Sequence, residues 1–257
     1  MNFSEDKFLP QSILYIFERL EQYNIFYWLD AGSLLKGVRD KSILSSSDID
    51  ISIFSDQIED LLKALNGIDE EGYRVEYNGG YPMLEDLVTI FLPSSVNRII
   101  AIDIYIYYKS EGSFIRRSFH KPIENSRSRH IFSLSKKILN NNKAFDKEVN
   151  FLSFNYLLKK CVIIMGKMIF FLYEITGSTL CFIIPEKYFS DFSQLRLYSR
   201  LFNIPKNYKK YLIYRYGDNW ETPISRDKWF PIWKKEGSNI LVSKKLSKSS
   251  FVKKYWI

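Results

Sequence analysis

This chain has few of the residues that build thiol, disulfide or histidine chemistry. Its 257 residues include two cysteines, Cys161 and Cys181, and two histidines, His120 and His130. The cysteines stand far apart in apolar surroundings, so we expect buried small hydrophobes rather than a disulfide or a metal pair. The histidines are too few and too distant from each other in sequence to favour a histidine-centred site.

The sequence also lacks a start typical of a secretory signal and a clean membrane span. Its first residues do not place positive charge before an apolar stretch, which predicts a cytoplasmic protein. The stretch from Cys161 to Pro185 is long enough to cross a bilayer. However, Lys167 and Glu174 lie inside it, and each would cost on the order of 3 kcal/mol at the membrane centre. We therefore expect one or two buried helices there, with peripheral membrane contact as the alternative.

Charge is unbalanced toward the positive side, with 37 Lys and Arg against 29 Asp and Glu and a net charge of +8. This excess predicts an anionic partner such as a nucleotide donor, a phosphorylated glycan or an anionic membrane surface, whereas nucleic acid is a competing interpretation that we do not favour. The length suits one large domain or two small ones. We expect a catalytic core over residues 1–125 and a helical, basic region over 126–257 that completes the substrate site.

Hydrophobic periodicity predicts a mixed α+β fold. Apolar residues at helical spacing predict helices over residues 9–23 and 58–65. Runs of β-branched and aromatic residues predict strands over residues 26–31, 48–53, 74–77, 87–92 and 99–108. This order of elements suits a mixed β-sheet with helices packed against it, followed by a mainly helical C-terminal part.

Two aspartates stand in alternate positions of an isoleucine-rich strand. Asp48, Asp50 and Ser52 share one face, and the isoleucines between them share the other. Aspartate is disfavoured in strands, and two carboxylates ~7 Å apart repel each other unless a cation lies between them. Asp103 is displayed in the same way in the strand over residues 99–108. If the two strands are neighbours, the three acids converge on a hard cation such as Mg²⁺.

A Gly-Ser pair lies upstream of these acids. Gly32 and Ser33 are interpreted as a turn with an N-cap, which opens a short helix over residues 34–38. The start of a helix favours an anion. Lys36 and Arg39 lie in or just beyond this helix, where they could add contacts to a phosphate.

With these motifs in place, the sequence resembles the LicD/fukutin family of phosphotransferases, which belongs to the nucleotidyltransferase superfamily. The resemblance is closest from Trp28 to Ile51 and weaker around Asp103. The segment from Tyr214 to Pro223 is similar to the family's C-terminal Tyr-Gly-x-x-Trp-x-x-Pro segment. The chain departs from the family at Lys36, where a glycine is common, and at its serine run, where the family usually has a Trp-Asp-Asp-like sequence (Ser45, Ser46 and Ser47).

The resemblance implies a nucleotidyltransferase-like fold and a metal-dependent transferase. Such an enzyme moves phosphocholine, ribitol phosphate or glycerol phosphate from a CDP-activated alcohol to a hydroxyl of a glycan or glycolipid and releases CMP, as in capsule or lipopolysaccharide biosynthesis. It implies Mg²⁺ or Mn²⁺ on the strand acids, which are also the expected catalytic residues (Asp48, Asp50 and Asp103). The expected substrate contacts are Gly32, Ser33, Lys36 and Arg39.

Other interpretations stay open at this point. A nucleotidyltransferase would use the same acids to transfer a nucleoside monophosphate to a small molecule, protein or RNA, and a basic binding module would need no chemistry. Arg39 could pair with Asp40 or Asp30 at the surface. Asp103 could be a hydrogen-bonded core acid.

Overall fold

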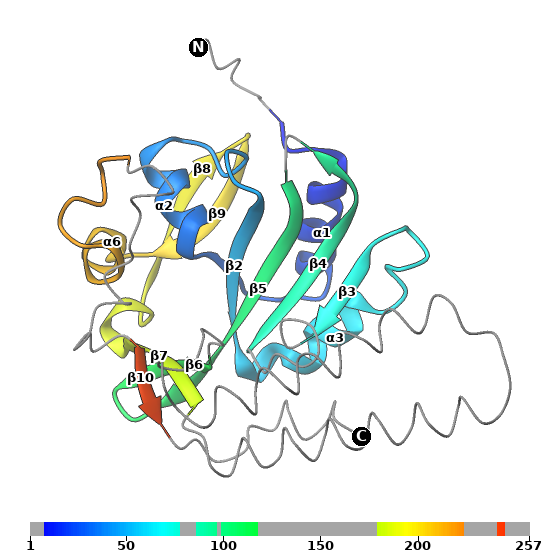
Figure 1. Ribbon diagram of the computed structural model, residues 1–257. Helices are drawn as coiled ribbons and strands as arrows, with labels where there is room; N and C mark the ends of the chain where they lie inside the picture. The colour runs from blue at the N-terminus through cyan, green and yellow to red at the C-terminus, as the bar shows by residue number, and fades with distance from the viewer. Residues whose placement is uncertain (1–7, 78–85, 97–98, 118–178, 224–240, 245–257) are drawn as a thin grey trace, which may run out of the picture. The chain divides into compact units, whose positions relative to one another are not determined.

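The computed structural model describes residues 8–77, 86–96, 99–117, 179–223 and 241–244 (Figure 1). The chain divides into two compact units. The first unit comprises Met1–Tyr77, Asp86–Arg116 and Phe182–Val242. The second comprises Asn78–Glu85, Arg117–Cys181 and Ser243–Ile257. The described residues fall almost entirely in the first unit, which holds all the elements of the candidate site.

The helices of the first unit follow the apolar spacing of the sequence. Helix α1 spans Gln11–Gln22 and α3 spans Ile58–Leu65, which confirms both predicted helices. Helix α2 spans Ala31–Arg39, and α6 spans Tyr208–Tyr216. Two 3-10 turns, η1 and η2, cover Ser55–Gln57 and Glu186–Tyr188.

The strands form a mixed sheet. The N-terminal strands are β1 (Trp28–Leu29), β2 (Asp48–Phe54), β3 (Arg74–Tyr77), β4 (Leu87–Val96), β5 (Ile99–Ser110) and β6 (Ser113–Arg117). The C-terminal strands are β7 (Thr179–Pro185), β8 (Phe192–Leu197), β9 (Arg200–Pro205) and β10 (Leu241–Lys244), of which β7 and β10 run from one unit into the other. Within the first unit the order is β6-β5-β2-β1-β9-β8, and β4 pairs with β5 and β3.

Strand direction in the centre of this sheet determines which residues meet. β2 and β5 run parallel, with Asp48 opposite Ala101 and Asp50 opposite Asp103. β4 is antiparallel to β5 and sets Thr89 opposite Asp103. β1 is antiparallel to β2 and parallel to β9, so a strand from the C-terminal part of the chain completes the sheet that carries the acids.

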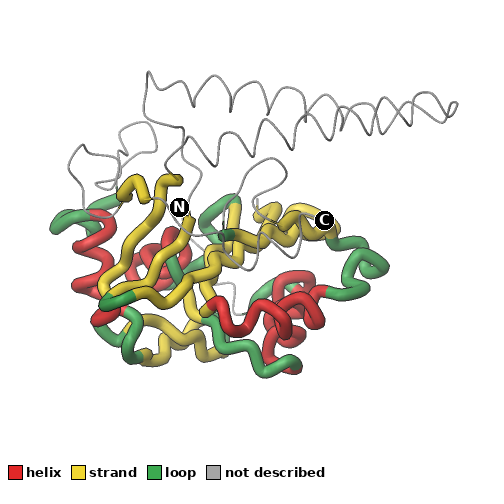
Figure 2. Tube along the Cα trace, turned by 90° about the horizontal axis from the view of Figure 1, so that it is seen from below, coloured by secondary structure: helices red, strands yellow, loops and turns green. Residues whose placement is uncertain are grey.

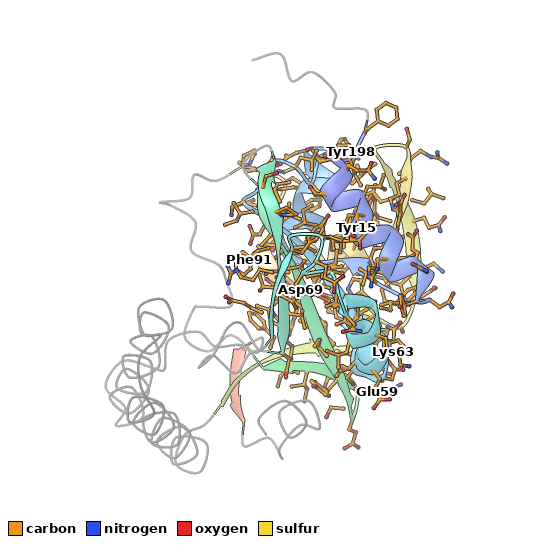
Figure 3. The ribbon with its side chains drawn as sticks, turned by 90° about the vertical axis from the view of Figure 1, so that its right-hand side faces the viewer. Tyr15, Glu59, Lys63, Asp69, Phe91 and Tyr198 are labelled. Atoms are coloured by element: carbon orange, nitrogen blue, oxygen red, sulfur yellow. The ribbon has the colours of Figure 1, made fainter. Side chains whose placement is uncertain are left out.

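The core lies on the isoleucine side of β2 and β5. Ile49, Ile51 and Ile53 are fully buried, as are Ile102, Ile104 and Ile106. Helix α1 lies behind the sheet in Figure 1 and α2 lies in front of β8 and β9, and Figure 2 shows the helices of this unit flanking the strands. Figure 3 shows Tyr15 on α1, whose ring stacks on that of Tyr73 at 5.4 Å. The α+β prediction is therefore confirmed, because alternating strand residues bury one apolar face under amphipathic helices.

Three local predictions need correction. The strand predicted over residues 26–31 covers only Trp28–Leu29, because Asp30 already caps α2. The alternation also predicts Ile100 on one apolar face with Ile102, Ile104 and Ile106, but Ile100 is 51% exposed. Residues 179–185, predicted as part of a buried helix, form β7, which agrees with their high content of β-branched and aromatic residues.

The remaining predictions for the C-terminal half lie largely outside the described residues. They include the helices expected between residues 126 and 178 and the surroundings of Cys161 and the Cys181 side chain. In the part of the chain that the structure describes, none of the helices has the length and apolar character that crossing a membrane requires.

Candidate active site

Three aspartates from two neighbouring strands lie together. Asp48 and Asp50 come from β2 and Asp103 from β5, and each offers a carboxylate oxygen that lies within 4.8 Å of the other two. Asp50 is buried, with 6% of its surface exposed, whereas Asp48 and Asp103 are half-buried. The parallel register of β2 and β5 thus brings together the three acids that the sequence singled out.

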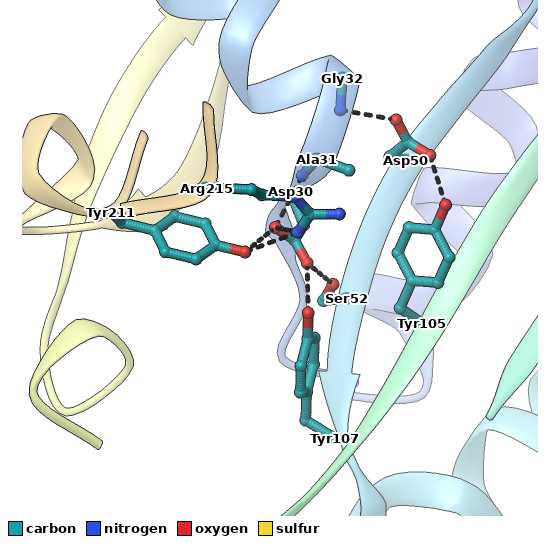
Figure 4. Close-up of polar contacts among 9 residues, drawn as sticks. All are labelled: Asp30, Ala31, Gly32, Asp50, Ser52, Tyr105, Tyr107, Tyr211 and Arg215. Carbon is teal, nitrogen blue, oxygen red and sulfur yellow. Dashed lines mark hydrogen bonds and ion pairs between the residues drawn. The ribbon is translucent and has the colours of Figure 1, made fainter. Parts of the chain in front are cut away.

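Asp50 is held by donors on both of its carboxylate oxygens. The backbone N–H of Gly32 donates to its Oδ2 at 2.8 Å, and the hydroxyl of Tyr105 donates to its Oδ1 at 2.9 Å (Figure 4). Its own backbone N–H donates to the Ser33 hydroxyl at 2.8 Å. Gly32 and Ser33 therefore connect the first turn of α2 to the strand that carries the acids.

The two outer acids have hydroxyl partners. Asp48 Oδ1 accepts hydrogen bonds from the hydroxyls of Ser47 at 2.8 Å and Ser46 at 3.3 Å. Asp103 Oδ1 accepts one from Thr89, its neighbour on β4, at 2.8 Å. Part of the serine run that departs from the family pattern thus orients Asp48.

The negative charges of the three aspartates repel one another. Burial, together with the charges of Asp48 and Asp103, raises the pKa of Asp50 from its ordinary value of 3.8 to about 7. Carboxylate oxygens are the ligands that Mg²⁺ and Mn²⁺ prefer. Because a divalent cation would relieve this repulsion, Asp48, Asp50 and Asp103 are suited by chemistry and spacing to hold one.

Gly32 lies so close to Asp50 that a larger side chain at this position would displace the Asp50 carboxylate. A Cβ at this position would lie 2.9 Å from Asp50 Oδ2. We expect Gly32→Ala to displace the Asp50 carboxylate and to weaken Mn²⁺ binding about 10- to 100-fold, as when an outer-shell partner of a metal ligand is lost. Isothermal titration of the purified variant with Mn²⁺ measures the effect.

The matched control is Gly37→Ala in the same helix. A Cβ there would meet Leu197 Cδ1 at 3.2 Å and no aspartate, while the gain in helix propensity would be similar. We expect the control to bind Mn²⁺ as the wild type does. If Gly32→Ala bound Mn²⁺ as tightly as the wild type does, the close contact between Gly32 and Asp50 would not be needed to position the carboxylate.

A second buried carboxylate, Asp30, fixes the start of α2. It is fully buried and is the N-cap of this helix, so the predicted cap at Ser33 is wrong. Five donors from four parts of the fold converge on its two oxygens at 2.6 to 3.1 Å (Figure 4). They are the backbone N–H of Ala31, the hydroxyls of Ser52, Tyr107 and Tyr211, and Nη1 of Arg215.

The Asp30 network also carries charge and backbone strain. Burial alone would raise the pKa of Asp30, but the Arg215 charge and the hydrogen bonds from Tyr211 and Ser52 together lower it. Ala31 has a φ of +45°, in the left-handed region that L-residues rarely adopt. Such a conformation persists where surrounding contacts enforce it, and here the cap contact and the Gly32–Asp50 contact lie on either side of it.

The two basic residues predicted to contact substrate lie in different surroundings. Lys36 donates from Nζ to the carbonyl of Ser45 at 3.2 Å, and burial lowers its pKa although Asp48, Asp40 and Asp50 oppose this shift. Arg39 makes a two-point contact with Asp40, at 2.6 and 2.8 Å. The ion pair that the sequence left open for Arg39 is therefore formed, and it is formed with Asp40.

Several residues of this region were not found by sequence reasoning. Asp30 was considered only as a partner of Arg39, although an aspartate directly before a helix is a common N-cap signal. Tyr105 was noted only for sharing a face with Asp103. Arg215 lies in the segment from Tyr214 to Pro223 that resembles the family, but no role was predicted for it. Tyr211 had no local signal, and the contacts of both residues with Asp30 span more than 180 residues of sequence.

Comparison with known proteins assigns these motifs to a family. Residues 24–144 match the family described as LicD/FKTN/FKRP, nucleotidyltransferase domain. An uncharacterized protein of Rickettsia prowazekii (strain Madrid E) is 29% identical over 99 residues, which cover 38% of this chain and 32% of the relative. The chain thus spans about a third of that relative's length.

Among solved structures, the lincosamide antibiotic adenylyltransferase LnuA with lincomycin bound is similar, with a TM-score of 0.36 and 12% sequence identity over 77% of this chain and 81% of that one. The family match contains the Gly-Ser pair and all three aspartates of the cluster. Residues 24–144 of this chain thus match the LicD/FKTN/FKRP nucleotidyltransferase domain, the family that the sequence motifs resemble.

Proposed function

We propose that this protein is a metal-dependent transferase that moves a phospho-alcohol from a CDP-activated donor to a hydroxyl of a glycan or glycolipid and releases CMP. The observation that carries the proposal is the convergence of Asp48, Asp50 and Asp103, whose carboxylate oxygens lie within 4.8 Å of one another. Phosphoryl transfer depends mainly on positioning and on neutralising charge. A cluster of carboxylates beside the start of a helix supports that kind of chemistry.

In this proposal Asp48, Asp50 and Asp103 hold Mg²⁺ or Mn²⁺. The cation, when bound, would neutralise the phosphate charge of the donor. Gly32 and Tyr105 keep the Asp50 carboxylate in place through their two hydrogen bonds. Since both donors come from regular elements of the fold, the carboxylate is positioned before any substrate arrives.

Lys36 is the proposed phosphate contact. Its Nζ donates to the carbonyl of Ser45, three residues before Asp48, at 3.2 Å, and the charges of Asp48 and Asp50 act on its pKa, which supports a place for this ammonium group near a donor bound at the acids. Ser33 contributes indirectly, because its hydroxyl holds the backbone of Asp50. We assign to Asp103 the role of accepting the proton of the attacking hydroxyl. Its half-buried position next to Asp50 supports this role.

Identifying the nucleotide that the protein releases tests the proposal. The protein is incubated with Mg²⁺, a glycan acceptor and, in separate reactions, CDP-choline, CDP-ribitol, CDP-glycerol, CTP and ATP. We expect CMP from at least one CDP-alcohol and no CMP after addition of EDTA. Chromatography of the nucleotides and a pyrophosphate assay measure the products.

Two outcomes would contradict the proposed function. Release of pyrophosphate from CTP or ATP would instead indicate transfer of a nucleoside monophosphate. Absence of any released nucleotide, together with nucleic-acid binding that weakens steeply as salt increases, would indicate a basic binding module. In that case the loss of Asp48 by substitution to Asn would leave binding unchanged.

A further inference from the structure

A buried arginine lies beside the acidic cluster. Arg215 is on α6, and only 6% of its side chain is exposed, opposite an Asp30 carboxylate that is fully buried. Figure 4 shows its guanidinium at the Asp30 carboxylate and the Tyr211 hydroxyl. Its charge is also among the groups that lower the pKa of Asp50, although burial dominates there. Arg215 therefore lies within electrostatic reach of the proposed catalytic acids.

The guanidinium of Arg215 has more donors than its described neighbours use. Nη1 donates to Asp30 Oδ1 at 3.1 Å and to the Tyr211 hydroxyl at 2.7 Å. Nε is buried and has no hydrogen-bond partner. Nη2 donates to none of the described residues. Of the five N–H groups that a guanidinium carries, the one on Nε is thus buried without an acceptor, and the two on Nη2 are not used by the described residues.

Unfilled donors on a buried cation are costly unless an acceptor reaches them. Asp30 compensates the charge of Arg215 but accepts a hydrogen bond only from Nη1, so the other N–H groups stay available. Phosphate oxygens suit it, because a guanidinium binds phosphate through two parallel charge-assisted hydrogen bonds. The contact with Asp30 uses only Nη1 of Arg215, so the rest of the guanidinium is available to a second anion.

We propose that Arg215 binds a phosphate of the nucleotide donor, at a diphosphate subsite that joins α6 to the three aspartates. This assignment rests on the proposed function and deepens it, because it gives the C-terminal segment a direct contact with the donor. Asp30 is then a positioning residue that aligns Arg215. The ligand class is a nucleoside diphosphate or its diphosphate group alone.

Arg215→Lys is the variant that tests this subsite, because it keeps a positive charge opposite Asp30 and removes the spare donors. The probes are CDP and inorganic pyrophosphate, each titrated calorimetrically in the presence of Mn²⁺. We expect both to bind about 10- to 100-fold more weakly than to the wild type. The affinity for Mn²⁺ alone should stay within about twofold, because the three aspartates are unchanged.

Arg200→Lys is the matched control. Arg200 is half-buried, pairs with Glu21, packs over the Phe17 ring and, like Arg215, has a buried Nε without a hydrogen-bond partner, but it does not lie beside the aspartates. We expect this control to bind CDP as the wild type does. A general effect of replacing a buried arginine would instead weaken both variants equally and would contradict the assignment.

The outcomes separate this inference from the proposed function. If the wild type binds CDP and Arg215→Lys binds it equally well at a lower melting temperature, Arg215 only fastens α6 and the subsite is refuted while the proposed function stands. If the wild type binds neither probe with Mn²⁺, both are refuted. If the lysine variant does not fold, ¹⁵N NMR of the arginine Nε–H groups in the wild type with Mg²⁺ replaces it. Pyrophosphate should then shift the Arg215 signal and leave that of Arg200 unchanged. An Arg215 signal that does not move would refute the subsite.

Discussion

Asp50→Asn is expected to abolish nucleotide release and, in the metal-free protein, to raise thermal stability at and above neutral pH. Asp50 is the central member of the cluster, with Asp48 on its own strand and Asp103 opposite it. An amide lacks the charge that a divalent cation needs, so the activity should fall by about 10³-fold, equivalent to several kcal/mol of lost metal assistance. The shape of the side chain is retained.

The effect on stability follows from the protonation of Asp50. Its pKa rises from 3.8 to about 7 on folding, because of burial first and then the neighbouring charges of Asp48 and Asp103. Between about pH 4 and 7 the folded state therefore binds more protons than the unfolded state. The free energy of unfolding must fall as pH rises through this window. The amide of the Asp50→Asn variant cannot ionise, so the variant lacks this loss.

Thermal denaturation in EDTA from pH 4 to 8, with nucleotide release assayed in parallel, measures both effects. Asp69→Asn is the control, since Asp69 is an exposed aspartate before β3 and its substitution should change neither quantity. Retained activity in Asp50→Asn would refute the metal assignment. If the melting temperature of Asp50→Asn depended on pH as that of the wild type does, the raised pKa of Asp50 would be refuted.

Asp30→Asn is expected to destabilise the fold strongly, by about 3–5 kcal/mol. The substitution leaves the Arg215 guanidinium buried without its counter-charge. It also introduces an amide with donors of its own among the five donors that converge on Asp30. For a chain of this size the melting temperature should fall by on the order of 10 °C.

Thermal and denaturant unfolding of Asp30→Asn measures the loss, with Asp40→Asn as the matched control. Asp40 also pairs with an arginine, but its side chain is 34% exposed, and an exposed ion pair contributes less than about 1 kcal/mol. Similar losses in the two variants would show that the Asp30 network does not stabilise the fold beyond a surface pair.

The elements around the acids were predictable because their signals are local. The apolar spacing of α1 and α3 and the alternation of β2 and β5 are contained within one element each, and they match the structure except at Ile100 of β5. The family resemblance from Trp28 to Ile51 also depends on short motifs. The sequence therefore predicted the α+β class and singled out Asp48, Asp50 and Asp103 before any contact between strands was known.

The boundary of α2 was misplaced because capping competes with strand pattern. The aromatic and apolar run over residues 26–29 predicted a strand that continued to Ala31, yet the carboxylate of Asp30 receives the first N–H of the helix and the strand ends at Leu29. Ile100 lies outside the apolar face although Ile99 before it is fully buried, and the pairing of β4 with β5 is irregular at this point, between Phe91 and Val96.

What the sequence alone determined is the local pattern of the site: which residue types lie on which face of which strand, and where the acids occur. What only the tertiary structure decided is which residues these acids meet. Parallel pairing set Asp103 opposite Asp50, and α6 returned from far along the chain to bring Arg215 to Asp30. Side-chain alternation is a property of a single strand. The register between strands and the packing of α6 against Asp30 depend on contacts between distant segments, which no local pattern encodes.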